Sequence, residues 1–246
     1  MTNYTEKLGN LAVVLGSQWG DEGKGKLIDI LSDDYKLVAR AAGGANAGHT
    51  IYLKDPDNPE KKNKYVFHLV PSGMLNEGCV CLIGNGVVLH LPTLMEEIEL
   101  LNNSGINTDG RILIADRTHL VFDYHKLIDG LQEEMKGDKK VGTTKRGIGP
   151  CYTDKVRRNG IRGHELLNFE AFTAKYNQNL EMFKKMYGDF DYDTEKELTE
   201  LKDISEKIKE WIVDGAYFLH DAMKKGENIL VEGANGAMLD VDHGTY

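Results

Sequence analysis

The stretch LAVVLGSQWGDEGKGKLIDIL, residues 11–31, decides the fold class of this chain. Its first five residues, 11–15, form a short apolar run that ends at Gly16, and this run predicts a buried strand. A glycine-rich turn follows, and residues 24–31 then place four apolar side chains at helical spacing. A strand, a glycine loop and a helix in this order form the opening unit of a parallel α/β sheet.

The glycine turn in this unit is suited to phosphate. Residues 20–26 fit the pattern G-x-x-x-x-G-K directly before the helix, so backbone N–H groups and lysine charge converge there. Leu27 stands where a P-loop has the Ser or Thr that ligates Mg²⁺. A metal therefore needs another oxygen, and Asp21 is the nearest candidate. The competing interpretation is a glycine turn with a capping aspartate.

The rest of the chain continues the alternation of strands and helices. Further strands are expected at residues 36–41, 80–83, 86–91, 111–115 and 228–231, helices at about 93–103, 123–136, 165–187 and 194–225, and a hairpin from 50–53 to 65–70 around a tip at 54–64. Thr93 with Glu96, and Thr194 with Glu197, have the spacing of capping boxes. Residues 137–163 have no periodicity and are typical of a functional loop. The pattern predicts an α/β fold, a mainly parallel central sheet flanked by helices, with a P-loop-NTPase-like phosphate loop after the first strand.

No clear domain boundary or internal repeat interrupts residues 1–246. We therefore expect one nucleotide-binding α/β domain over the whole chain. The sequence stops at Tyr246, directly after a motif-like segment. The fold is expected to continue beyond this residue, so that the domain is truncated at its C-terminus.

Composition narrows the functional classes. The chain of 246 residues is 41% hydrophobic and 28% charged, which is typical of a globular protein. A net charge of −9 argues against non-specific nucleic-acid binding. We find no apolar run of the roughly 20 residues that a membrane span needs and no signal peptide, so we expect a cytoplasmic protein. Cys79, Cys81 and Cys151 are too few for a disulfide scaffold and are expected to be small buried hydrophobes.

A second glycine loop, GGANAGHT at residues 43–50, follows the second expected strand. It supplies Asn46, His49 and Thr50 as polar groups. A histidine here can polarise an oxygen or neutralise developing charge, and the alternative is a structural histidine. We expect this loop to lie near the first one, because ligands gather at the carboxyl ends of parallel strands.

Two later segments also carry polar groups. Residues 139–162 hold eight Lys or Arg against one acid, Asp154, and their hydroxyls, glycines and cations suit a phosphate monoester. A solvated basic loop is the alternative. In the segment EGANG, residues 232–236, the amide of Asn235 can read a base edge through its donor and acceptor.

Five motifs in fixed order carry a resemblance to a known family. They are QWGDEGKGK, GGANAGHT, GNGVVLH, GTTKRGIGPCYTDK and EGANGAMLDVDHGTY. From about residue 11 to 246 the chain resembles the adenylosuccinate synthetases. The resemblance implies a ligase of AMP biosynthesis that joins IMP and L-aspartate through 6-phosphoryl-IMP, consuming GTP with Mg²⁺ as cofactor. It also implies a homodimer. Family members are much longer, so their aspartate and guanine sites are expected after Tyr246 and this chain alone is expected to be inactive.

The resemblance also implies roles for individual residues. Asp21 matches the general base and a metal ligand, His49 matches the general acid or electrophilic partner, and the Gly48 carbonyl matches a second metal ligand. Arg158 matches the arginine that reaches the IMP of the partner subunit. Many members have Gln where Asn235 stands. The implied GTP contacts are Gly20, Asp21, Glu22, Gly23, Lys24, Gly25, Lys26, Gly48, His49 and Thr50, and the implied IMP contacts are Asp21, Lys24, Asn46, Ala47, Gly48, His49, Thr144, Arg158 and Asn235.

Two other functions would use the same loop. A GTP-binding switch or interaction module needs neither Asp21 as a base nor an anion site between Thr144 and Arg158, and failure to bind IMP would favour it. Another nucleotide-dependent ligase would phosphorylate a different acceptor.

Overall fold

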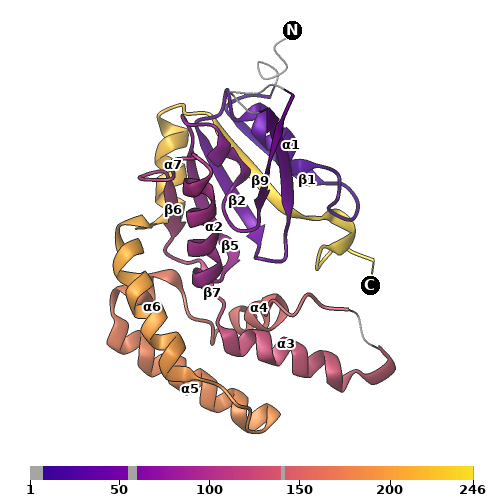
Figure 1. Cartoon of the computed structure of the whole chain (residues 1–246), viewed down its shortest axis with the longest axis vertical. Coiled ribbons are helices and arrows are strands. Elements are labelled where there is room, and N and C mark those ends of the chain that lie inside the picture. The colour runs from indigo at the N-terminus through magenta and orange to yellow at the C-terminus, as the bar shows by residue number, and fades with distance from the viewer. Residues whose placement is uncertain (1–7, 55–59, 140–141, 246) are drawn as a thin grey trace.

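A seven-stranded parallel sheet forms the centre of the molecule. The computed structural model describes residues 8–54, 60–139 and 142–245 (Figure 1). The strand order is β1-β9-β2-β5-β6-β8, and β7 pairs with β5. The strands are β1 Leu11–Gly16, β2 Leu37–Gly43, β5 Val80–Leu89, β6 Ile112–Ala115, β7 His119–Leu120, β8 Ile212–Val213 and β9 Ile229–Gly236. Because β9 returns between β1 and β2, the last strand of the chain lies beside the first loop.

Helices cover both faces of the sheet. Leu37 and Ala39 of β2 pack on α7, and Val38 between them belongs to the core cluster that includes residues of α1 and α2. Successive strand side chains point to opposite faces, so α7 covers one face while α1 and α2 cover the other. The three helices are α1 Lys24–Leu31, α2 Leu91–Asn103 and α7 Gly215–Lys224. This arrangement confirms the predicted fold class, a mainly parallel sheet flanked by helices.

Four further helices form the lower part of the molecule in Figure 1. They are α3 Asp123–Met135, α4 Ile148–Arg157, α5 Phe169–Tyr187 and α6 Thr194–Ile208. Two strands outside the main sheet, β3 His49–Lys54 and β4 Lys62–Phe67, form the predicted hairpin. Of the tip expected at 54–64, residues 54 and 62–64 belong to the strands, and 55–59 lie outside the described residues. No helix in the described parts of the chain is long and apolar enough to cross a membrane.

The strand at residues 11–15 is only half buried, which corrects the prediction of a buried strand. Ala12 and Val14 are buried, whereas Leu11, Val13 and Leu15 are 47%, 54% and 70% exposed. β1 is an edge strand, and its buried side chains share their core cluster with α1. The alternating burial shows that only one face of β1 is covered.

Three predicted segments are joined or divided differently in the structure. The two strands expected at 80–83 and 86–91 are one strand, β5, in which Gly84 and Gly86 allow close approach to β2: a Cβ at Gly86 would lie 2.0 Å from the Ala41 carbonyl oxygen. The expected loop at 137–163 contains α4. The helix expected at 194–225 is divided into α6 and α7, because β8 between them pairs with β6.

Neither predicted capping box forms. The imidazole of His90 caps α2 by accepting the N–H of Thr93, and Asp193 caps α6 by accepting the N–H of Lys196. Glu197, expected to cap its own helix, instead accepts the N–H of Asp123 at the start of α3. The three cysteines are free and buried, as predicted.

Candidate functional site

The loop after β1 is held by its own charged side chains. The Glu22 carboxylate accepts the backbone N–H groups of Gln18 at 2.9 Å and Gly20 at 3.2 Å. The buried Lys24 ammonium donates to the Gly20 carbonyl at 2.9 Å. Gly23, at φ +78°, is the N-cap of α1, and no side chain caps this helix. The N–H groups at the start of α1 are thus without a side-chain cap, as a phosphate-binding loop requires.

Close backbone approach brings the other motifs to this loop. A Cβ at Gly236 would lie 2.0 Å from the Gln18 carbonyl oxygen, so the end of β9 lies against the phosphate loop. A Cβ at Gly25 would lie 2.6 Å from the Cβ of His49, so the histidine packs against the first turn of α1. The structure therefore joins three motifs that are far apart in the sequence.

His49 is buried, with 7% of its surface exposed, and one edge of its ring is held. Its Nδ1 lies 2.5 Å from Oε1 of Glu232 and 3.1 Å from Oγ of Ser72. Its Nε2 is also buried and has no hydrogen-bond partner among the described residues. Burial alone would raise the pKa of Glu232, but the hydrogen bond from His49 and the charge of Arg40 lower it. Glu232 is therefore a carboxylate, and the ring nitrogen of His49 that faces away from it, Nε2, is unpartnered among the described residues.

A cavity of about 810 Å³ opens at the carboxyl ends of the strands. Its lining residues are Leu15, Gly16, Ala41, Ala42, Gly86, Ile148, Gly149, Tyr152, Lys155, Val156, Gly233, Ala234, Asn235, Gly236, Ala237, Leu239, Asp240, Val241 and His243. Tyr152 fixes its inner wall, because the hydroxyl accepts the Gly43 N–H at 3.0 Å and donates to the Gly86 carbonyl at 2.8 Å. Asn235 lines the cavity, whereas Asp21 and His49 lie outside its lining.

The predicted anion residues Thr144 and Arg158 lie on either side of α4. Thr144 is exposed before α4, and Arg158 is exposed at the C-cap of α4, with φ +66°. Ile148, at the other end of the helix, packs against the second glycine loop. Ten residues of α-helix place roughly 15 Å between the two ends of α4. Arg158 lines a second cavity of about 380 Å³ with Arg162, Glu165 and Lys155, and Lys155 also lines the first cavity.

The remaining predicted contacts lie on the two loops. Asn46, Gly48 and Thr50 are exposed, while Ala47 is buried. Nearby, a Cβ at Gly48 would meet only the His68 ring, at 3.8 Å, so its surroundings are open. The carboxylate of Asp21, which is exposed, and the Gly48 carbonyl are both oxygen donors, the class that Mg²⁺ prefers. The donor set of these two residues therefore fits the predicted metal.

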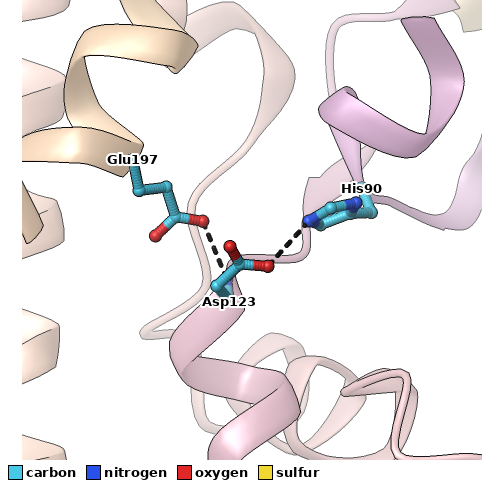
Figure 2. Close-up of side chains that lie close together, drawn as sticks. All are labelled: His90, Asp123 and Glu197. Carbon is cyan, nitrogen blue, oxygen red and sulfur yellow. Dashed lines mark hydrogen bonds and ion pairs between the residues drawn. The ribbon is translucent and has the colours of Figure 1, made fainter. Parts of the chain in front are cut away.

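A second titratable cluster lies between helices (Figure 2). His90, Asp123 and Glu197 offer ligand atoms within 4.8 Å of one another. However, Nδ1 of His90 accepts the Thr93 N–H, so Nε2 carries the proton and donates to Asp123 at 3.2 Å. Both oxygens of Glu197 are also used, by the N–H of Asp123 and by the hydroxyl of Tyr176. A metal on Nε2 would break the cap of α2, so this cluster joins helices rather than holding a cation.

The cluster predicts a pH-dependent stability. Burial raises the pKa of Glu197 to about 7, so the folded chain binds this proton more tightly than the unfolded chain. The stabilisation is complete below about pH 4.5 and is lost as pH rises towards 7. We expect Glu197→Gln, which mimics the protonated form, to remove this dependence of the free energy of unfolding on pH. The change that it removes is at most about 3 kcal/mol. Urea unfolding at pH 5 and pH 8 measures it, with the exposed Glu195→Gln as control. If the free energy of unfolding changed equally between pH 5 and pH 8 in wild type and Glu197→Gln, Glu197 would not be the group responsible.

Sequence analysis assigned no individual role to Glu232, Arg40, Ser72 or Tyr152. A signal existed for the first two, since each is a single charge in an otherwise apolar strand. The structure pairs them: Arg40 of β2 is in register with Glu232 of β9. Both side chains are fully buried.

The fold and the site define an α/β protein whose glycine loops and polar side chains meet at the carboxyl ends of parallel strands, the class that binds ligands at this edge. A family model described as adenylosuccinate synthetase matches residues 13–246. The chain therefore belongs to the adenylosuccinate synthetase family.

Relatives and solved structures agree with this family. The chain is 48% identical over 239 residues to adenylosuccinate synthetase of Malassezia globosa, covering 97% of this chain and 53% of the relative. It is 52% identical over 239 residues to the chloroplastic enzyme of Chlamydomonas reinhardtii, covering 96% and 50%. The fully ligated Plasmodium falciparum enzyme superposes with a TM-score of 0.88 at 43% identity, covering 97% of this chain and 54% of that one. Succinoaminodeoxyadenylate synthetase of cyanophage S-2L, at 21% identity and a TM-score of 0.63, shares the fold. The chain thus spans about half the length of these relatives.

Proposed function

We propose that these residues act in a GTP-dependent ligase that forms adenylosuccinate from IMP and L-aspartate in AMP biosynthesis. Family membership supports this proposal, and so does the buried His49 with a free Nε2 beside the phosphate loop. The relatives are about twice as long. For the tests proposed here, the full-length enzyme is a protein that carries residues 1–246 and a second half like that of the relatives.

The proposed chemistry explains the unusual loop. Asp21 removes the N1 proton of IMP, which concentrates negative charge on the 6-oxygen. That oxygen attacks the γ-phosphorus of GTP in line and yields 6-phosphoryl-IMP and GDP, and the amine of aspartate then displaces phosphate at C6. His49 stabilises the charge that spreads over the transferring group. Bound Mg²⁺, held by Asp21 and the Gly48 carbonyl, would supply further electrostatic stabilisation of the phosphates.

The substrate contacts follow the loops. The backbone of residues 20–26 and 48–50 is assigned to the GTP phosphates. Asn235 lines the cavity of about 810 Å³, where its amide is available to the hypoxanthine edge. Asn46, Ala47 and Thr144 are assigned to the same nucleotide. A homodimer in which Arg158 serves the partner's site completes the proposal.

The proposal is tested by product and stoichiometry. The full-length enzyme should form adenylosuccinate only when IMP, GTP and aspartate are all present, with one phosphate released per product. Absence of IMP binding in calorimetry would favour a GTP-binding switch, and phosphorylation of another acceptor would favour a different ligase. A cytoplasmic location also stays a prediction, since the Chlamydomonas relative is named chloroplastic.

A further inference from the structure

We infer that Glu232 is a positioning residue for His49, one that holds the Nδ1 edge of the imidazole and leaves Nε2 as the nitrogen that meets the transferring phosphoryl group. The second part of this inference rests on the proposed function. The first part rests on the contacts of two side chains from different regions of the chain.

The sheet fixes the carboxylate rigidly. Glu232 lies on β9, which pairs with β1 on one side and β2 on the other, and its side chain is fully buried. Oε2 accepts the backbone N–H of Ser72 at 2.8 Å, and Oε1 accepts the Ser72 hydroxyl at 2.9 Å. Oε1 also lies 2.5 Å from Nδ1 of His49. Both oxygens are therefore committed, and the carboxylate has one orientation.

This contact determines the tautomer of the histidine. An ionised carboxylate only accepts hydrogen bonds, so Nδ1 of His49 carries a proton and donates it to Glu232. The free nitrogen is then Nε2, which is buried and unpartnered in the described part of the chain. Because the ring packs against Gly25 of α1, the free nitrogen belongs to a histidine fixed against the phosphate loop. For histidines that bind metals, loss of the group that holds the second ring nitrogen typically costs about 10–100-fold in activity or metal affinity, and we expect a loss of this order here.

A competing role for Glu232 is to neutralise Arg40. The Arg40 guanidinium is fully buried and donates to the carbonyls of Ala42, Gly44 and His68. A buried cation needs a nearby anion, and Glu232 is its neighbour in register. If that were its whole function, loss of the negative charge would lower stability and leave the chemistry of His49 unchanged.

Glu232→Gln separates the two roles, because it keeps the size and removes the charge. In the full-length enzyme we expect kcat to fall about 10–100-fold, with KM for IMP and GTP within about threefold. Glu97→Gln is the matched control. Glu97 is also a buried carboxylate near Arg40, but it holds the N–H groups of His68, Leu69 and Val70. This control should lower the melting temperature and leave kcat within about threefold. Equal kcat in wild type and Glu232→Gln would overturn the inference.

A double mutant tests whether Glu232 acts through His49. We expect the kcat of His49→Asn to be unchanged when Glu232→Gln is added, because the positioned group is already absent. If the double variant showed the product of the two single fold-losses in kcat, the two residues would act independently and the inference would be overturned.

Nitrogen-15 NMR of labelled histidine tests the contact without any assay or any change at Glu232. We expect His49, assigned by the loss of its signals in His49→Asn, to be protonated at Nδ1 in the ligand-free full-length enzyme. A neutral ring protonated only at Nε2 would overturn the inference. An enzyme that shows the expected signal yet makes no adenylosuccinate would refute the proposed function and leave the Glu232–His49 contact standing.

Discussion

Asp21→Asn in the full-length enzyme should lower kcat for adenylosuccinate formation by more than about 10²-fold, the usual contribution of a general base. IMP and GTP affinities should stay within about tenfold, because the amide keeps the shape of the carboxylate. The effect follows from the loss of proton abstraction at N1, without which the 6-oxygen remains a poor nucleophile. Initial rates and calorimetric titrations with each nucleotide measure the two quantities.

The Asp21 side chain differs in its contacts from the neighbouring charged side chains of the loop. Glu22 and Lys24 are both used to hold the backbone of the loop. Among the described residues no hydrogen bond holds the exposed Asp21 carboxylate. It is therefore the acidic group of the loop that can meet a substrate or a metal. Asp29→Asn, the same substitution on α1, is the control and should leave kcat unchanged within about threefold. A near wild-type rate for Asp21→Asn would remove the base assignment.

The fold could be predicted wherever a local pattern decides it. The helix at 24–31 matches α1 at both ends, because a glycine loop and an apolar stripe define it locally. The break between α6 and α7 could not be predicted in this way. It depends on Ile212–Val213 pairing with β6, a contact between distant segments; the local signal, Asp214 as the N-cap of α7, marks a helix start but not this strand. The predicted capping box at Glu197 does not form for the same reason, because its carboxylate accepts the N–H of Asp123 on another helix.

In the candidate site, too, local motifs could be predicted and contacts between distant segments could not. Glycine-rich motifs were visible in the sequence, and the order of parallel strands brings them together at one edge. Glu232 and Arg40 had no visible link, because β9 inserts between β1 and β2 only in the folded sheet. Each charge alone is unexplained in an apolar strand, and only their register accounts for both. The roles of the predicted contact residues stay predictions.

We expect Arg158 to serve the site of another subunit. It is exposed at the end of α4, away from the end that packs on its own glycine loop, and its φ of +66° is a conformation that few non-glycine residues adopt. In a two-fold dimer each proposed site would then combine Asp21 of one chain with Arg158 of the other. Asp21→Asn and Arg158→Leu should each be nearly inactive alone in the full-length enzyme.

Mixing these two inactive variants should restore activity. In a mixed dimer one site carries both substitutions and the other carries neither. Random exchange at equal amounts makes half of the dimers mixed, each with one intact site of two, so activity should rise to roughly a quarter of wild type. Arg157→Leu, one position earlier, is the control and should be active without mixing. Subunit exchange shown by mass-tagged chains, together with no recovery of activity, would mean that Arg158 does not act across the dimer.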